Sequence, residues 1–113
     1  MQVYWKPALG LAVIGSTLFL IGGPGAAWAQ KSPKDIYLDK CAVCHGPDGA
    51  GKTARGRKAK VKDIRETAGK MSAAEMIKIV EAGKGANMDG YGKEFSKDQI
   101  TALVDYYRSL AKP

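Results

Sequence analysis

The sequence predicts an all-α domain, and three observations support this fold class. Ser72-x-x-Glu75 and Ser96-x-x-Gln99 are capping boxes, in which a serine and the side chain three residues later satisfy free amides at the start of a helix. Apolar residues recur at helical spacing behind both boxes. No stretch alternates apolar and polar residues for long enough to predict a β-strand.

The first expected helix spans residues 33–44. Ser32 is a good N-cap, and Pro33 suits the first helical turn because the amide hydrogen that proline lacks would have no partner there. Asp35 stands three residues after the cap. Four further residues keep the helical spacing: Ile36, Tyr37, Lys40 and Cys41.

Two more helices are expected behind the capping boxes. The helix after Ser72 stops at Gly83, and its apolar stripe consists of Met76, Ile77, Ile79 and Val80. The helix after Ser96 has an apolar stripe of Ile100, Leu103, Val104, Tyr107 and Leu110. A short helical turn is also expected around residues 61–67.

Residues 1–29 have the pattern of a secretory signal peptide. Lys6 provides a basic start, an apolar run ends at a Gly-Gly-Pro-Gly break, and Ala27-Trp28-Ala29 places small residues where a signal peptidase reads them. The alternative is a retained membrane anchor, because the uncharged residues 7–30 are long enough to span a bilayer. In either case we expect residues 30–113 to form one domain in the periplasm or an equivalent compartment.

A domain of this size needs something besides its core for stability. Cleavage after Ala29 leaves 84 residues, and so short a chain buries only about 60–65% of its unfolded surface. A disulfide, a metal or a cofactor commonly supplies the difference. One histidine excludes any site that needs two, and two cysteines exclude an all-cysteine zinc site.

The run Cys41-Ala42-Val43-Cys44-His45 matches C-x-x-C-H, the attachment signature for c-type haem. Two thiols three residues apart, near one helical turn, can reach both vinyl groups on one porphyrin edge, and the next residue can direct its imidazole at the iron. We therefore expect one covalently bound haem c, with Cys41 and Cys44 as thioethers and His45 as an axial ligand.

Three other interpretations of the cysteine pair remain open. A thiol–disulfide redox pair normally lies in a βαβ unit, and the sequence predicts no β-strand. A disulfide closing so short a loop would stabilise little. A zinc site would need a second Cys/His pair, and none follows.

Across residues 33–110 the chain resembles the single-haem class I cytochrome c family, particularly its small bacterial members. The resemblance implies a cytochrome c fold, with about three main helices wrapped around one covalently attached haem, crossed N- and C-terminal helices, and electron transfer as the function. Four landmarks carry it: Tyr37 four residues before the first cysteine, Cys41–His45 followed by the glycine-rich residues 46–51, Met88-Asp89-Gly90-Tyr91, and the segment from Leu103 to Tyr107.

The chain departs from that family at three positions. Asp89 follows the methionine where a proline is usual, and Pro33 stands where a glycine often lets the terminal helices approach closely. Arg57, twelve residues past His45, replaces a proline whose carbonyl orients the histidine in many members. The partner of the His45 ring is therefore not named by the sequence.

Met88 is the candidate for the second axial ligand of the iron. It lies in a loop between two expected helices, 43 residues beyond His45, and the family resemblance supports the assignment. Met76 lies on an apolar helical stripe and Met71 directly precedes an N-cap, so packing explains both. The alternatives are five-coordinate iron and ligation by a lysine such as Lys84. Asn87 and Tyr91 are candidates for tuning the sulfur or covering the haem.

His/Met ligation would fill both axial positions of the iron and raise its reduction potential. These properties are typical of an electron carrier, so we expect no catalytic residues and no small-molecule substrate. We expect an exported monohaem c-type cytochrome that carries single electrons between redox partners. One alternative is a haem subunit that feeds electrons into a larger redox enzyme complex. Another is a five-coordinate gas-binding haem protein. Membrane contact is expected only if the N-terminal segment is retained.

The surplus positive charge lies in one segment. Residues 51–70 contain eight basic and two acidic side chains, a net charge of +6, whereas the rest of the expected mature chain is balanced. One interpretation is that the segment is a solvated face. The other is that some of its basic side chains neutralise haem propionates while the rest steer the protein towards acidic surfaces on its redox partners. Nucleic acid is not an expected partner, because export and the lack of a binding motif argue against it.

Overall fold

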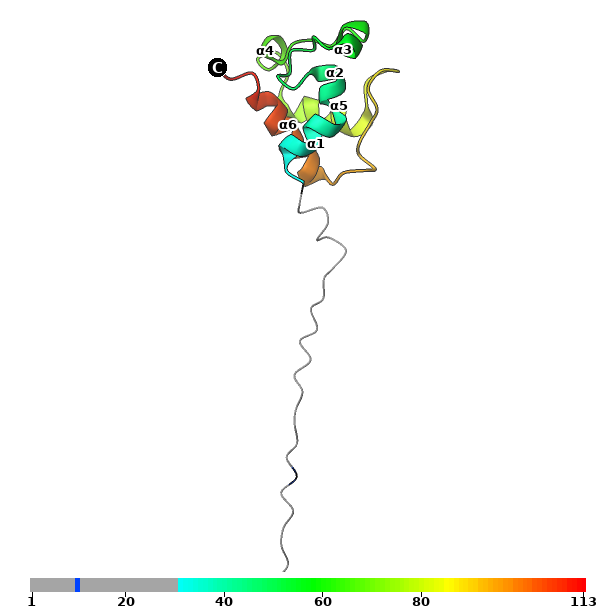
Figure 1. The fold of residues 1–113 in the computed structure, drawn as a ribbon, viewed down its shortest axis with the longest axis vertical. Helices are drawn as coiled ribbons and strands as arrows, with labels where there is room; N and C mark the ends of the chain where they lie inside the picture. The colour runs from blue at the N-terminus through cyan, green and yellow to red at the C-terminus, as the bar shows by residue number, and fades with distance from the viewer. Residues whose placement is uncertain (1–9, 11–30) are drawn as a thin grey trace, which may run out of the picture.

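The structure, a computed structural model, describes residue 10 and residues 31–113. This part of the chain contains six helices. The expected signal peptide falls on residues 1–29 and lies outside the described residues, apart from Gly10. None of the helices described is long and apolar enough to cross a membrane. Figure 1 shows their arrangement: α1 Pro33–Lys40, α2 Ala42–His45, α3 Ala54–Lys58, α4 Ile64–Thr67, α5 Ala73–Ala82 and α6 Lys97–Ser109.

The all-α prediction is confirmed. Within residues 31–113 the only β-type pairing is an isolated bridge between Lys84 and Met88. The helices after Ser72 and Ser96 begin with the expected capping boxes, and α4 lies where a helical turn was expected. The short helix α3 was not expected; Thr53 starts it by accepting a hydrogen bond from the amide of Gly56.

The first expected helix is present but divided. Ser32 caps α1 with a complete capping box, and α1 ends at Lys40 rather than running to residue 44. Cys41 separates α1 from α2 with backbone angles of φ −113° and ψ −38°. Gly46, with φ +80°, ends α2 directly after His45. The two cysteines and the histidine therefore occupy a separate turn between α1 and Gly46.

Helices α1 and α6 pack against each other and form the first part of the core (Figure 1). Tyr37, only 2% exposed, lies at their contact. Its ring meets Tyr106 edge-on at a centroid distance of 5.3 Å and stacks on Tyr107 at 5.8 Å. This pairing of the first and last helices agrees with the crossed terminal helices that the family resemblance implied.

A second core cluster joins α4, α5 and α6. Its buried residues are Ile64, Met76 and Val104, one from each helix. Ile64 has no exposed surface, and its burial anchors the four-residue helix α4 to the core. The two clusters share half-buried neighbours such as Tyr107, so α6 connects both halves of the core.

Candidate haem site

A cavity of about 580 Å³ lies between the α1–α2 side of the domain and the α5 side. This volume is within the range of roughly 300–1,000 Å³ that is usual for ligand and cofactor pockets. The four residues assigned from the sequence all line it: Cys41, Cys44, His45 and Met88. The fold thus brings Met88 to the same cavity as the C-x-x-C-H turn, although the two are far apart in the sequence.

The two cysteines are free thiols, each partly buried in the cavity wall. Burial raises the pKa of Cys41 to about 11, so this thiol is protonated at neutral pH. A dithiol oxidoreductase depends instead on a cysteine of lowered pKa, because the thiolate is the nucleophile. The environment of Cys41 therefore argues against the redox-pair interpretation.

His45 presents a neutral imidazole to the cavity. Burial lowers its pKa, which favours the uncharged ring that can ligate a metal. Its Nδ1 atom lies 3.1 Å from the hydroxyl oxygen of Tyr107, and the two rings meet edge-on at 5.0 Å. Burial also raises the pKa of Tyr107 to about 12, so its hydroxyl stays protonated at neutral pH.

The turn that carries these ligand candidates is held by hydrogen bonds to its free carbonyls. The Tyr37 hydroxyl donates to the carbonyl of Gly46 at 2.6 Å, and the Thr53 hydroxyl donates to the carbonyl of Val43 at 2.7 Å. Gly56 in α3 approaches so closely that a Cβ there would overlap the carbonyl oxygens of Cys44 and Gly51. Helix α3 therefore supports the C-x-x-C-H turn through direct contact between their main chains.

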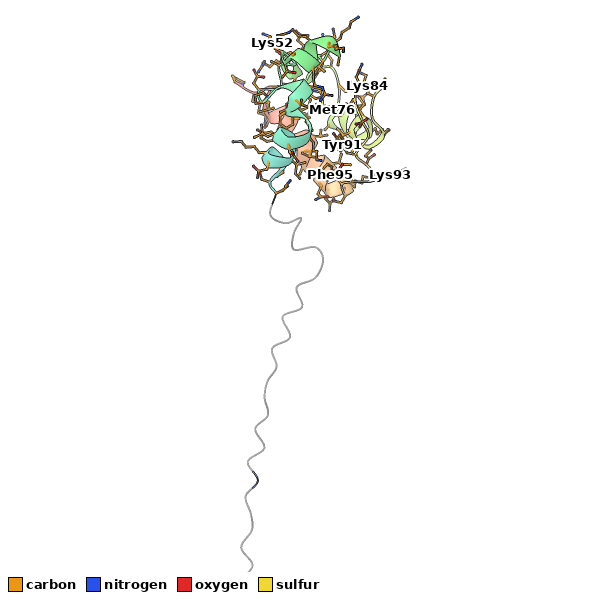
Figure 2. The ribbon with its side chains drawn as sticks, turned by 45° about the vertical axis from the view of Figure 1, so that its right-hand side comes forward. Lys52, Met76, Lys84, Tyr91, Lys93 and Phe95 are labelled. Carbon is orange, nitrogen blue, oxygen red and sulfur yellow. The ribbon has the colours of Figure 1, made fainter. Side chains whose placement is uncertain are left out.

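The Met88 loop is folded back onto the end of α5. The Tyr91 amide donates to the carbonyl of Val80 at 2.8 Å, and the Lys84 amide donates to the carbonyl of Met88 at 2.9 Å. Gly83, with φ +83°, has Met88 O only 2.7 Å from the place where a Cβ would lie. In Figure 2 Lys84 lies at the edge of the domain away from α1. Tyr91 lies nearer, and its hydroxyl donates to the carbonyl of Lys40 at the end of α1 at 3.4 Å. The loop thus places Met88 in the lining of the same cavity as the C-x-x-C-H turn.

Three methionines line the cavity, and their surroundings distinguish them. Met76 is buried in the second core cluster, and its sulfur lies 3.7 Å from Nη1 of Arg108. Met71 packs against the same cluster, and its carbonyl accepts a hydrogen bond from Arg108 at 2.8 Å. Met88 is half-buried and belongs to a loop rather than to the core. Lys84 also lines the cavity and stays an alternative ligand.

The donor set fits haem better than zinc. Two free thiols, a neutral imidazole and a thioether line the same cavity. Among residues 31–113, no group of three or more His, Cys, Asp or Glu side chains is placed to hold a metal ion. A protein zinc site would need such a group.

Comparison with known proteins decides the family. A family model described as "Cytochrome C oxidase, cbb3-type, subunit III" matches residues 29–106, which include every ligand candidate. The chain belongs to this family of c-type cytochromes. Membership implies covalently bound haem c and identifies residues 29–106 as a cytochrome c electron-transfer domain.

Individual relatives and solved structures support the assignment to c-type cytochromes. The cbb3-type cytochrome c oxidase subunit FixP of Azorhizobium caulinodans is 31% identical over 87 residues, which are 77% of this chain and 29% of FixP. The chain thus spans less than a third of that relative. A solved structure described as KustC0563 c-type cytochrome is 25% identical with a TM-score of 0.67, over 73% of this chain and 100% of the other. A tyrosine-to-phenylalanine variant of it, 23% identical over 71% of this chain and 99% of its own, has a TM-score of 0.64 and supports the fold alone.

The sequence did not predict the roles of three residues at the site. Thr53 and Gly56 brace the turn from α3, a helix without a strong sequence signal. Tyr107 was assigned to an apolar stripe and to the C-terminal landmark of the family resemblance, but not to His45. Its contact with His45 joins residues that are 62 positions apart. Thr53 was the one local signal for α3, since threonine is a common N-cap.

Proposed function

We propose that this chain binds one haem c and passes single electrons as a haem subunit of a larger redox enzyme complex. The observation that carries the proposal is the match of residues 29–106 to a family of oxidase subunits, together with a cavity that gathers both thiols, His45 and Met88. The free monohaem carrier expected from the sequence has the same site, but the family and FixP favour the subunit.

Each ligand candidate has a separate role in this proposal. Cys41 and Cys44 would hold haem as thioethers, and His45 and Met88 would ligate its iron. When bound, haem supplies an iron that accepts and releases one electron. The Met88 thioether favours ferrous iron because it is a soft ligand. If His45 and Met88 both bound the iron, no ligand position would be left for a gas, so carbon monoxide binding distinguishes this proposal from the gas-binding alternative.

Location outside the cytoplasm is part of the proposal. Residues 1–29 have the signal-peptide pattern, and residues 30–113 would then form the cytochrome domain in the periplasm. Isolation from the native host should recover the domain either cleaved after Ala29 or still attached to its N-terminal segment. Co-purification with a membrane oxidase would support the subunit role, and recovery of a free 84-residue protein would support the carrier.

Covalent attachment gives the first prediction. Acid–organic extraction of the protein from its native host should leave the pigment on the polypeptide, and its intact mass should include one haem. Replacing Cys41 and Cys44 together with alanine should abolish attachment, because no other cysteine exists. The matched control is Ser109→Ala, since Ser109 is exposed on α6 and does not line the cavity. Pigment that extracts freely from the native protein would contradict the proposal.

The basic segment of residues 51–70 has two sets of side chains. Arg55, Lys60 and Lys62 line the cavity, where they are placed to neutralise anionic groups of a cofactor. Lys52 and Lys58 are exposed to solvent. Within the described chain, the only ion pair of this segment joins Arg65 to Asp63 at 3.0 Å. Most of its positive charge is therefore free to attract an acidic partner surface.

Ionic strength gives the second prediction. Oxidation of the reduced protein by membranes from its host should slow roughly tenfold between about 0.01 M and about 0.5 M salt, since screening weakens electrostatic steering. Replacing Lys52 and Lys58 with glutamine should flatten this dependence. The same change at Lys93 and Lys97 is the control, because Figure 2 places Lys93 at the other end of the domain from Lys52. A flat salt dependence of the wild-type rate would remove the docking role.

A further inference from the structure

Tyr107 touches the imidazole that the proposed function assigns to iron. Its hydroxyl oxygen lies 3.1 Å from Nδ1 of His45, and its ring meets the His45 ring edge-on at an interplanar angle of 73°. The tyrosine ring is itself fixed, because it stacks on Tyr37 at an interplanar angle of 25°. The hydroxyl is therefore held at a defined place beside His45.

The direction of this hydrogen bond follows from the chemistry of the ring. A neutral imidazole that ligates a metal through Nε2 must carry its hydrogen on Nδ1. Nδ1 is then a donor and needs an acceptor. The phenolic oxygen of Tyr107 is an acceptor at hydrogen-bond distance.

The backbone carbonyls around the turn already accept other hydrogen bonds. The carbonyl of Gly46 accepts from the Tyr37 hydroxyl, and the carbonyl of His45 accepts from the amide of Gly51 at 2.8 Å. The carbonyl of Arg57, at the position where many class I cytochromes have proline, accepts from the amide of Lys60 at 3.2 Å. Within residues 31–113, the hydrogen-bond partner of the His45 Nδ1 atom is the Tyr107 hydroxyl and not a main-chain carbonyl.

We propose that Tyr107 is the positioning residue for His45: its hydroxyl accepts the Nδ1 hydrogen, fixes the tautomer that leaves Nε2 free for iron, and sets how strongly the ring donates electrons. The proposal rests on the proposed function for the role of His45 as a ligand. A hydrogen-bond acceptor on Nδ1 makes a metal-bound imidazole more basic and stabilises ferric iron. Removing the acceptor should therefore favour the reduced protein.

The test compares two phenylalanine substitutions in the holoprotein. Tyr107→Phe keeps the ring and its stacking but removes the hydroxyl. Its reduction potential should rise, so that the ratio of reduced to oxidised protein at a fixed solution potential increases several-fold. Tyr106→Phe is the matched control, since Tyr106 also packs on Tyr37 but has no hydrogen bond to His45. An unchanged potential in Tyr107→Phe, or an equal shift in both variants, would overturn the proposal.

A second measurement needs no variant. The chain has a single histidine, so selective ¹⁵N-histidine labelling of the reduced protein gives one Nδ1–H signal. This hydrogen should exchange slowly with solvent and show a nuclear Overhauser effect to the Tyr107 ring. Fast exchange and no such effect would refute the contact while leaving reversible electron transfer intact. Loss of haem binding or of reversible reduction in the wild-type protein would instead refute the proposed function.

Discussion

Replacing Met88 with alanine should lower the reduction potential by roughly 0.2 V, a fraction of the about 0.8 V over which axial ligands set haem potentials. The thioether favours ferrous iron, and its loss removes that preference. The same change should let carbon monoxide bind the reduced protein rapidly, because one axial position becomes open. Potentiometric titration and carbon monoxide mixing measure the two effects. The charge-transfer band of a thioether bound to ferric iron should disappear from the optical spectrum.

The control for this experiment is the conservative change Met76→Leu. Met76 also lines the cavity, but it is buried in the core and its sulfur lies beside Arg108. This change should leave the potential and the spectrum close to those of the wild type. If Lys84→Ala rather than Met88→Ala opened the iron to carbon monoxide, the lysine alternative would replace the methionine. Unchanged spectra in Met88→Ala would exclude Met88 as a ligand.

Replacing Gly56 with alanine should lower the free energy of unfolding by about 3 kcal/mol, the upper part of the usual cost of overpacking. The added methyl group would overlap the carbonyl oxygens of Cys44 and Gly51. Both are main-chain atoms, so neither can turn away as the end of a flexible side chain would. The C-x-x-C-H turn or α3 must then shift. Denaturant titration of the holoprotein measures the loss.

Gly69→Ala is the matched control for this prediction. A Cβ at Gly69 would meet no atom within 4 Å, and its backbone lies outside the left-handed region. The substitution should leave the free energy of unfolding within about 1 kcal/mol of the wild-type value or raise it slightly. Equal losses in the two variants would show that close backbone packing at Gly56 does not stabilise the domain.

Local signals predicted the parts of the fold that local chemistry determines. The capping boxes at Ser72 and Ser96 mark the starts of α5 and α6, because the two residues that form each box are only three apart. The expected division of the chain after residue 29 remains a prediction, since that segment lies outside the described residues. The roles of Cys41, Cys44, His45 and Met88 as haem ligands are also still predictions.

The parts that the sequence did not predict depend on distant contacts. Helix α3 supports the C-x-x-C-H turn where the main chain of Gly56 contacts the carbonyls of Cys44 and Gly51, and no spacing rule predicts such a contact. The partner of His45 was left unnamed because a residue 62 positions away provides it. Tyr107 has the same helical spacing as its apolar neighbours, and only the folded arrangement distinguishes its hydroxyl.

The contact of Tyr37 with both Tyr106 and Tyr107 has a consequence for biogenesis. Helix α1 cannot pair with α6 until the chain has been synthesised through residue 107. Before that moment, Cys41 and Cys44 lack the wall of the cavity that α6 supplies. If haem is attached to these thiols as proposed, they would be most accessible for attachment at that stage, and the docking of α6 would then complete the cavity around the bound group.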